Sequence, residues 1–399
     1  MVKRDLFDHG LPIYVCGPGV STMIGKSVLG SWLLCGLIEA QAGGKGWEAI
    51  KPEPNLPPLT EIIAAGDTLY LGTFGKGVYR STDEGATWKR LDSAYGRAQN
   101  VRRLVSHGGY LFLGSAAGGV YRSGDQGQSW QAANQGLYDS TAARKGLGDV
   151  LALHSFGFDL FACGSGTSIY RSSDKGATWN AFDSGLTGIR EGSQSANCIA
   201  HIGAKLFLGT QRGLYRSLDN GATWGLVKGG MEDTAHIRSL SVYGNVILAG
   251  MGWDGYTGGG IYRSADSGGT WTRVPNATID KSVIPVNAFV VSGSVIFAAL
   301  DDLRGIFHSG DAGISFADAD SSDLMGGAVA MALQGPYLFS TGLGVVWRRP
   351  VAEMATALIS SNRRRGFKPR PIREGSRIFL GSALERRDSR GRAISSPIR

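Results

Sequence analysis

The feature that most constrains this chain is a stretch of twelve residues that appears five times. The first copy, GVYRSTDEGATW, occupies positions 77–88. Four close copies follow it, and they end at Trp130, Trp179, Trp224 and Trp271. A sixth and more divergent copy, GIFHSGDAGISF, ends at Phe316 and keeps the aspartate in register. The six aspartates are 42, 49, 45, 47 and 45 residues apart, so the chain consists largely of one repeated unit.

Each repeat has the pattern of four short strands. In the first repeat, residues 61–66, 69–73, 77–81 and 87–91 form apolar or β-branched runs, and turns rich in Gly and Asp separate them. No long stretch has the period of an amphipathic helix. A strand-rich repeat of roughly 40–50 residues is typical of the blades of a β-propeller. We therefore predict an all-β fold made of four-stranded antiparallel blades.

The two ends of the repeat region together complete one further blade. Residues 328–350 supply three strand-like runs but no copy of the twelve-residue stretch. Residues 43–50, GGKGWEAI, look like the end of such a stretch, with Trp47 in the tryptophan position and a short strand after it. Joining the two segments gives seven blades over residues 43–350. It also closes the ring and removes the exposed sheet edges of an open one.

The repeated pattern Ser-x-Asp-x-Gly-x-Thr-Trp resembles the Asp-box, or bacterial neuraminidase repeat, family over roughly residues 44–350. Sialidases, sortilin-type receptors, xyloglucanases and photosystem II assembly factors share this repeat. The resemblance implies a propeller in which each box is the turn between the third and fourth strands of a blade.

The chemistry of the box indicates a structural role. Asp83 can accept hydrogen bonds from backbone N–H groups of its own turn, and Gly85 can supply a positive φ. Thr87 can direct its hydroxyl back to the turn, and Trp88 can cover the hairpin. We assign the same role to the whole set, namely Asp83, Asp125, Asp174, Asp219, Asp266 and Asp311 with Trp88, Trp130, Trp179, Trp224 and Trp271.

A functional surface is expected at the opposite end of the blades, which we call the top, where loops join the fourth strand to the next first strand and the second strand to the third. The most distinctive of these loops is MGWDGYTGGG, residues 251–260. Exposed aromatic side chains beside a carboxylate suit stacking on a sugar or anchoring a protein; a self-packed loop is the alternative. The ligand-binding candidates are Trp253, Asp254, Tyr256, Arg190, Glu191 and Asp301.

Enzymatic activity is the alternative function, and no catalytic residue can be assigned to it. A resemblance to sialidases would imply an arginine triad, a Tyr–Glu nucleophile pair and an Arg-Ile-Pro stretch before the first box, and that stretch is missing. Arg102, Arg103 and Arg238 lie near the starts of predicted inner strands without forming a recognisable triad. A xyloglucanase-like enzyme would need two carboxylates across a cleft, for which Asp149 and Asp233 are among several loop acids.

The histidines and cysteines indicate neither a metal nor a cofactor. His154, His201, His236 and His308 are far apart in the sequence, without metal-ligand spacing. Cys163 and Cys198 lie within apolar strands, which favours buried free thiols; a single bridge in an oxidising compartment is the alternative.

The basic charge is confined to the end of the chain. The net charge is +8, but residues 363–399 contain twelve Lys and Arg against three Asp and Glu, and the remainder has a net charge of −1. The body therefore has no basic surface suited to nucleic acid. Residues 351–399 weakly resemble a shortened type IX sorting domain, with a disordered basic tail as the alternative.

The N-terminus is typical of an export signal. The apolar run 28–38 is too short to span a bilayer permanently, and Ala40-Gln41-Ala42 suits cleavage. We expect a signal over residues 1–42, with Met23 as a second candidate start and an N-terminal helix as the alternative. The mature protein is then a monomeric, secreted, cell-surface or periplasmic bacterial protein without a membrane span. Its top loops bind a protein partner or a glycan; a glycoside hydrolase is the alternative.

Overall fold

The structure is a computed structural model of the 399-residue chain. It describes residues 46–53, 55–91, 99–116, 118–137, 149–164, 169–183, 186, 195–252, 259–275, 284–301, 305–319, 324, 327–342 and 344–354. All of these belong to the compact unit that ends at Ala355. The predicted export signal and nearly all of the basic tail lie outside the described residues, so both stay predictions.

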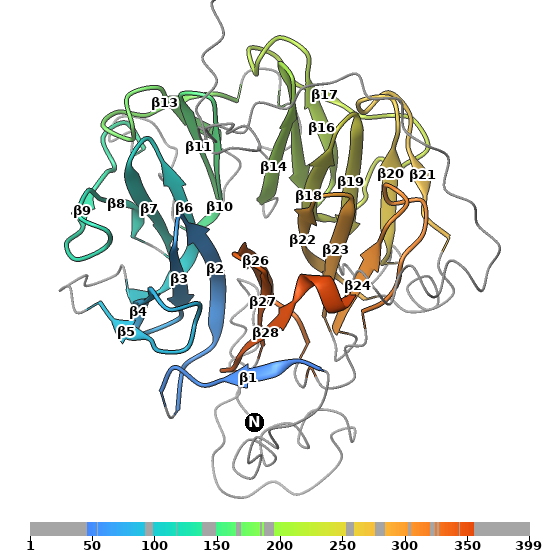
Figure 1. The fold of residues 1–399 in the computed structure, drawn as a ribbon. Coiled ribbons are helices and arrows are strands. Elements are labelled where there is room, and N and C mark those ends of the chain that lie inside the picture. Colours follow the sequence, from blue (N-terminus) through green and yellow to red (C-terminus); the bar gives the residue numbers. More distant parts are fainter. Residues whose placement is uncertain are drawn as a thin grey trace, which may run out of the picture. The chain divides into compact units, whose positions relative to one another are not determined.

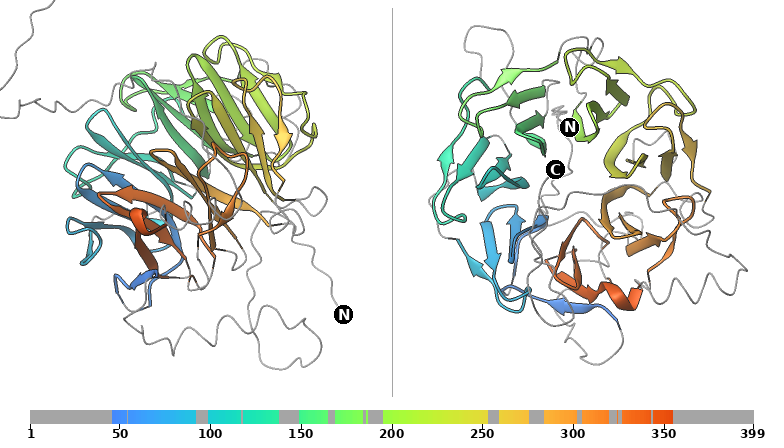
Figure 2. Two further views of the ribbon diagram at one scale, coloured as in Figure 1. Left: turned by 45° about the vertical axis from the view of Figure 1, so that its right-hand side comes forward. Right: turned by 45° about the horizontal axis from the view of Figure 1, so that its top comes forward.

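The described strands form seven antiparallel sheets of four strands each, arranged around a central axis (Figures 1 and 2). In six sheets the spatial order of the strands follows the chain. The prediction of a seven-bladed all-β propeller is therefore confirmed. We number the blades 1 to 7 from the sheet that begins with β2.

The strands are named by their place in the blade. The first, innermost strands are β2 (Leu59–Ala65), β6 (Val101–His107), β10 (Val150–Phe156), β14 (Ala196–Ile202), β18 (Ile237–Tyr243), β22 (Val286–Ser292) and β26 (Ala330–Gln334). The second strands are β3 (Thr68–Thr73), β7 (Tyr110–Ser115), β11 (Asp159–Gly164), β15 (Lys205–Thr210), β19 (Val246–Met251), β23 (Val295–Leu300) and β27 (Tyr337–Thr341). The third strands are β4 (Gly77–Ser81), β8 (Gly119–Ser123), β12 (Ile169–Ser172), β16 (Gly213–Ser217), β20 (Ile261–Ser264), β24 (Gly305–Ser309) and β28 (Val346–Pro350). The outer strands are β5 (Lys89–Arg90), β9 (Gln131–Ala132), β13 (Asn180–Ala181), β17 (Gly225–Leu226), β21 (Thr272–Arg273), β25 (Ala317–Asp318) and β1 (Glu48–Ile50).

The N-terminal strand closes the ring. β1 pairs antiparallel with β28, with Glu48 opposite Arg348 and Ile50 opposite Val346. Blade 7 thus takes its outer strand from the start of the propeller and its other three strands from the end (Figure 2). This confirms the predicted closure. After β28 the chain makes a helical turn over residues 351–354, in which Met354 is buried.

The hydrogen bonds inside each box hold a tight turn. In the first copy the backbone N–H of Thr87 donates to Asp83 Oδ1 at 2.9 Å, and Ser81 Oγ donates to the same oxygen at 2.7 Å. The hydroxyl of Thr87 donates to Asp83 Oδ2. Bonds that stabilise the ionised carboxylate lower its pKa, and in the second copy the Ser129 hydroxyl and N–H lower the pKa of Asp125 to about 2. The outer strands are shorter than predicted because the Thr and Trp before them belong to this turn.

Two successive residues of each box have positive φ, of which the sequence indicated only the glycine. Gly85 has φ 81°, and Glu84 before it has φ 54°. The residue before the box glycine has φ between 54° and 59° in all six copies, although none of these residues is glycine. The left-handed region is unfavourable for a residue with a side chain. The hydrogen bonds to the aspartate therefore hold the turn in a shape that its local sequence disfavours.

The box glycines also lie against the preceding blade. A Cβ placed on Gly221 of blade 4 would lie 1.9 Å from the ring of Phe182 in blade 3. Equivalent close approaches join Gly268 to Phe207, and Gly85 of blade 1 to Phe339 of blade 7. Only a residue without a side chain lets these rings pack on the turn, so each box fixes its blade to the previous one.

Arginines of the third strands complete these junctions. Arg216 Nη1 of blade 4 donates to the carbonyl of Gly268, in the box of blade 5, at 2.8 Å. Corresponding bonds run from Arg122 to Lys175, from Arg263 to Ala312 and from Arg348 to Glu84, at 3.2, 2.8 and 2.8 Å. We call this contact the arginine clasp. The matching position of blade 6 is the buried His308, and the next blade there has no box.

Arg348 combines the clasp with ring closure. Besides its bond to blade 1, it pairs with both carboxylate oxygens of Glu48 in β1, at 2.7 and 3.2 Å. Its guanidinium also lies 5.1 Å from the centre of the Tyr337 ring. One side chain therefore connects the closing strand, the composite blade and the first box.

A glycine substitution tests the packing of the box on the preceding blade. We expect Gly221→Ala to lower the free energy of unfolding by more than about 2 kcal/mol, because its methyl group would clash with Phe182 and overpacking adds to the cost of positive φ. Gly203→Ala is the matched control, since Gly203 has φ 57° with open space around it, and it should cost roughly 1 kcal/mol. Chemical denaturation measures both. Equal losses would contradict the packing argument.

A second pair of substitutions tests ring closure. Arg216→Ala removes a clasp alone, and we expect it to cost roughly 2 kcal/mol, as for a hydrogen bond from a charged group. Arg348→Ala also removes the pair with the half-exposed Glu48, which should add up to about 1 kcal/mol. The midpoint of urea denaturation compares the two variants. If Arg348→Ala is no more destabilising than Arg216→Ala, the closing role is wrong.

Candidate binding site at the upper rim

A repeated irregularity marks the beginnings of the innermost strands. In blades 1 to 6 the register of the first strand shifts after its first residue. Such a bulge leaves one residue outside the ladder and redirects its side chain. The residues passed over are Thr60, Arg102, Leu151, Asn197, Arg238 and Asn287. We define the upper rim as these residues, their immediate neighbours and the loop residues that contact them.

Two consecutive arginines dominate one side of the rim. Arg102 Nη2 lies 3.3 Å from Asp149 Oδ2 of blade 3, and its guanidinium lies 5.1 Å from the centre of the Phe74 ring of blade 1. Arg103 Nε lies 3.9 Å from Glu61 Oε2 of blade 1. The pair from blade 2 therefore holds carboxylates of both neighbouring blades.

Glu61 is the rim carboxyl with a raised pKa. Its burial raises the pKa from 4.5 to about 7, although Arg103 and the N–H of Ile62 act in the opposite direction. Near neutral pH Glu61 is therefore only partly ionised, and it neutralises Arg103 incompletely.

Arg238 provides a third guanidinium on the rim. Its Nε donates to Asn287 Oδ1 at 2.5 Å. Burial lowers its pKa, the carboxylate of Asp301 raises it, and the positive charge of Arg103 lowers it. The charges of Arg103 on blade 2 and Arg238 on blade 5 therefore repel across the ring, and both act on the thiol of Cys198.

Amide and hydroxyl side chains hold the other part of the rim in place. Asn197 Nδ2 donates to the carbonyl of Ile237 at 2.9 Å, and Asn287 Nδ2 donates to that of Ala328 at 2.8 Å. Ser239 Oγ donates to the carbonyl of Val286 at 2.6 Å. Each bond crosses from one blade to the next, so the strand that carries Arg238 is fixed to the blades on both sides.

The predicted ligand-binding residues are only partly described. Asp301 follows β23, where its N–H donates to the carbonyl of Pro285 at 3.0 Å, and its charge acts on Arg238. The other candidates, Trp253, Asp254, Tyr256, Arg190 and Glu191, lie outside the described residues. Sequence reasoning noted the arginines but missed Glu61, because neither the bulges nor the cross-blade contacts have a sequence signal.

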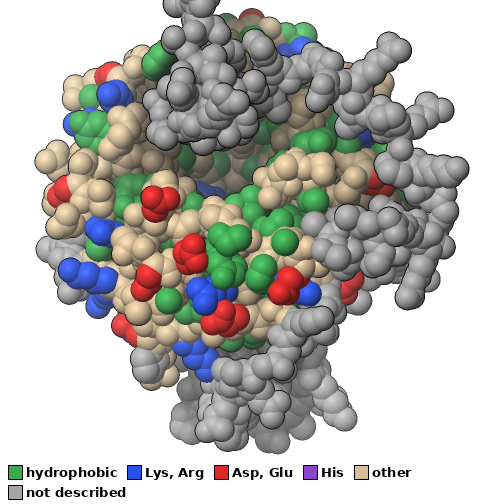
Figure 3. Space-filling model, in the orientation of Figure 1, with side chains coloured by type: hydrophobic (Ala, Val, Ile, Leu, Met, Phe, Trp, Pro, Cys, Tyr) green, Lys and Arg blue, Asp and Glu red, His purple; other side chains and the backbone are tan. Residues whose placement is uncertain are grey.

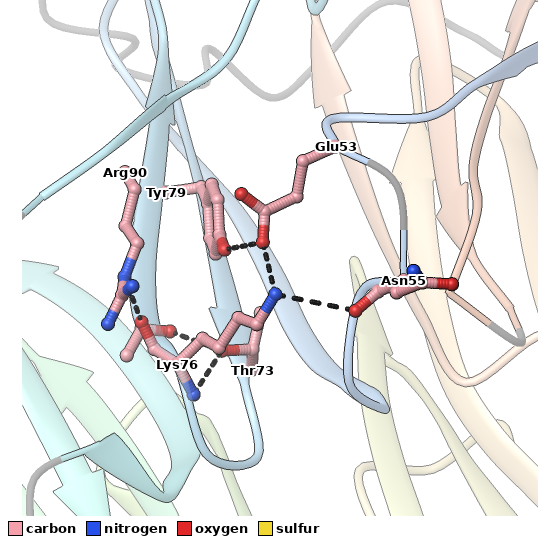
Figure 4. Close-up of polar contacts among 7 residues, drawn as sticks. Glu53, Asn55, Thr73, Lys76, Tyr79 and Arg90 are labelled. Carbon is pink, nitrogen blue, oxygen red and sulfur yellow. Dashed lines mark hydrogen bonds and ion pairs between the residues drawn. The ribbon is translucent and has the colours of Figure 1, made fainter.

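A tyrosine–glutamate pair exists, but its setting is structural. Tyr79 OH donates to Glu53 Oε1 at 2.7 Å, and Lys76 Nζ donates to the same oxygen at 2.5 Å (Figure 4). Lys76 and Tyr79 lower the pKa of Glu53 and keep it ionised. Tyr79 is only 1% exposed, and tyrosine recurs at this place in the repeats. The pair attaches the segment after β1 to blade 1 and does not offer a nucleophile to a substrate.

Two histidines that are far apart in the sequence are in contact in the structure. His154 Nε2 of β10 lies 3.1 Å from His201 Nδ1 of β14. The prediction that each histidine stands alone is wrong for this pair, because residues 47 apart fall on adjacent innermost strands. In the described part of the chain no group of three or more His, Cys, Asp and Glu side chains is placed to hold a metal ion.

Cys163 and Cys198 are free, as the sequence predicted. Burial raises the pKa of both thiols, that of Cys198 to about 12. Neither is therefore a ready nucleophile.

Charges of both signs are mixed on the surface. On the face turned to the viewer in Figure 3, Lys and Arg side chains lie among Asp and Glu side chains. Among the described residues, no helix is both long and apolar enough to cross a membrane.

Comparisons with known proteins show the fold. No protein-family description and no curated protein sequence matches the chain. It resembles the solved structure of "YCF48 bound to D1 peptide" with 16% identity and a TM-score of 0.59, covering 78% of this chain and 97% of that one. It resembles the GH74 xyloglucanase from Xanthomonas campestris with 18% identity and a TM-score of 0.56, covering 77% and 54%.

A third similar structure belongs to a longer protein. The chain resembles the extracellular domain of a hybrid two-component system from B. thetaiotaomicron, with 12% identity and a TM-score of 0.59. The match covers 76% of this chain and 40% of that one, so the chain spans less than half of its length. The chain is therefore a seven-bladed propeller that resembles these three structures in fold.

The raised pKa of Glu61 gives a measurable pH dependence. Between pH 4.5 and about 7 the folded protein binds a proton at Glu61 that the unfolded chain has lost, so this residue makes stability fall as pH rises through that window. Glu61→Gln removes the titration. We expect the melting temperature of the variant minus that of the wild type to be larger at pH 8 than at pH 5. Glu232→Gln, which removes an exposed carboxyl group, is the control with which the change is compared. If the difference in melting temperature between Glu61→Gln and wild type is the same at both pH values, the raised pKa of Glu61 is refuted.

Proposed function

We propose that the protein is a binding module that holds an acidic segment of a partner protein at the upper rim. The observation that carries this proposal is the placement of guanidinium groups at the bulged strand starts of blades 2 and 5, with Arg103 beside Glu61 and Arg238 beside Asn287; their like charges repel each other. A carboxylate placed between them would relieve that repulsion, and guanidinium groups bind carboxylates with strong, directional hydrogen bonds. Glu61 and Asp301 offset the two charges only in part, because Glu61 is partly protonated near neutral pH.

The rim is suited to binding because it is preorganised. Its arginines sit on bulged innermost strands of blades 2 and 5, and the Asn197 and Ser239 bonds join the strand of Arg238 to both neighbouring blades. A rigid site loses little conformational entropy when a ligand binds. The similar propeller solved with a bound peptide shows that this fold can serve peptide recognition.

Hydrolysis of a glycan is the alternative, favoured by the similarity to a xyloglucanase propeller. The one rim carboxyl with a raised pKa, Glu61, is paired with an arginine among the described residues. Glycosidase chemistry ordinarily uses two carboxyl groups on either side of the scissile bond. The described geometry therefore supports binding more directly than it supports catalysis. Export through residues 1–42 remains part of the proposal.

Peptide arrays test this function with the purified chain. We expect preferential binding of acidic over basic peptides, and an affinity about 10-fold weaker in Arg103→Gln/Arg238→Gln, which corresponds to roughly 1.4 kcal/mol. Lys89→Gln/Lys175→Gln removes the same charge away from the rim and is the matched control.

Two outcomes would contradict the proposal. One is equal weakening in the rim and control variants, which would indicate nonspecific attraction by charge. The other is turnover of a fluorogenic glycoside that Glu61→Gln abolishes, which would favour the hydrolase.

A further inference from the structure

The contact between His154 and His201 has no part in the binding function proposed above. The two side chains come from the innermost strands of blades 3 and 4, and their ring centres are 5.4 Å apart. Phe156, two residues after His154 on the same strand, stacks on His201 with 3.8 Å between the ring centres. The imidazoles are therefore held by two rigid strands and one aromatic ring.

The distance between the facing nitrogens suits a shared metal ion. Imidazole nitrogens bind Zn²⁺ at about 2.0–2.1 Å, and two ligands at a tetrahedral angle are then about 3.3 Å apart. His154 Nε2 and His201 Nδ1 are 3.1 Å apart, a few tenths of an ångström less. Both rings would have to turn so that their lone pairs meet at one ion beside the line that joins the two nitrogens.

Neutral imidazole is the form that binds a metal ion. The hydrogen bond between the two rings needs one donor and one acceptor nitrogen, so at least one of the facing nitrogens carries a free lone pair. The proton now shared between the facing nitrogens would move to the far nitrogen of its ring, so no proton need leave the pair.

We propose that His154 and His201 form a site for a divalent transition metal ion of the zinc class that links blades 3 and 4. Neutral imidazole nitrogens select Zn²⁺, Cu²⁺ or Ni²⁺ over Mg²⁺ and Ca²⁺, which prefer oxygen. Water completes the coordination, since the described residues offer no third His, Cys, Asp or Glu ligand there. The ion would cross-link blades 3 and 4 at a junction where the third-strand arginine, Arg171, pairs with Asp159 of its own blade.

Thermal melting of the full chain, prepared without a histidine tag, tests the site. We expect the melting temperature to rise as Zn²⁺ is titrated in excess over the protein, because an ion that binds only the folded form stabilises it, and Mg²⁺ to leave it unchanged. His154→Gln and His201→Gln should each abolish the shift. His107→Gln is the matched control, because His107 also lies on an innermost strand but contacts the carbonyl of Phe158.

Cobalt provides a second measurement that does not depend on stability. Visible d–d absorption of bound Co²⁺ should appear in the wild type and in His107→Gln, and disappear in His201→Gln. If His154→Gln does not fold, the half-buried His201 carries the test alone. A shift of equal size in wild type and His201→Gln, or no response to Zn²⁺ and Co²⁺, would overturn the proposal. Neither result would affect peptide binding at the rim, so the two proposals fail separately.

Discussion

The structure depends on the junction between one blade and the box of the next. The aspartate holds the box in an unfavourable left-handed shape, and that shape exposes a backbone carbonyl to an arginine and a bare glycine to an aromatic ring. The hydrogen bonds within the turn thus determine contacts between blades. This explains why a chain would repeat the same dozen residues: each copy packs its glycine on the preceding blade, and four of the six copies also accept an arginine clasp.

Much of the fold could be predicted because it is periodic. The spacing of the aspartates indicated six blades, and Trp47 indicated that a seventh takes its closing strand from the N-terminal side. Within the box, the sequence indicated Gly85 but not the positive φ of Glu84, because the second depends on hydrogen bonds to Asp83 and not on the residue type. The local sequence was sufficient to predict the backbone conformation where the residue type alone determines it, as at Gly85.

The rim could be predicted only in outline, because its properties arise between blades. Arg103 and Arg238 are 135 positions apart in the sequence, yet their charges interact. His154 and His201 are likewise brought together by the ring and not by a motif. The bulge at Arg102 is a departure from regular strand pairing, and the alternation of hydrophobic residues does not predict it. The scaffold of a repeat protein can therefore be predicted from the repeat itself. The residues that differ between copies form the candidate site, and their contacts could not be predicted.

Blade 7 holds both of its neighbours through consecutive residues of one strand. Arg348 reaches forward to Glu84 of blade 1, while Arg349 reaches back to the carbonyl of Ala319 beside blade 6. Because β28 is the last of the described strands along the chain, these two contacts form only after nearly the whole propeller has been synthesised. Until then β1 lacks the strand with which it pairs. During translation, closure of the ring therefore follows synthesis of the first six blades.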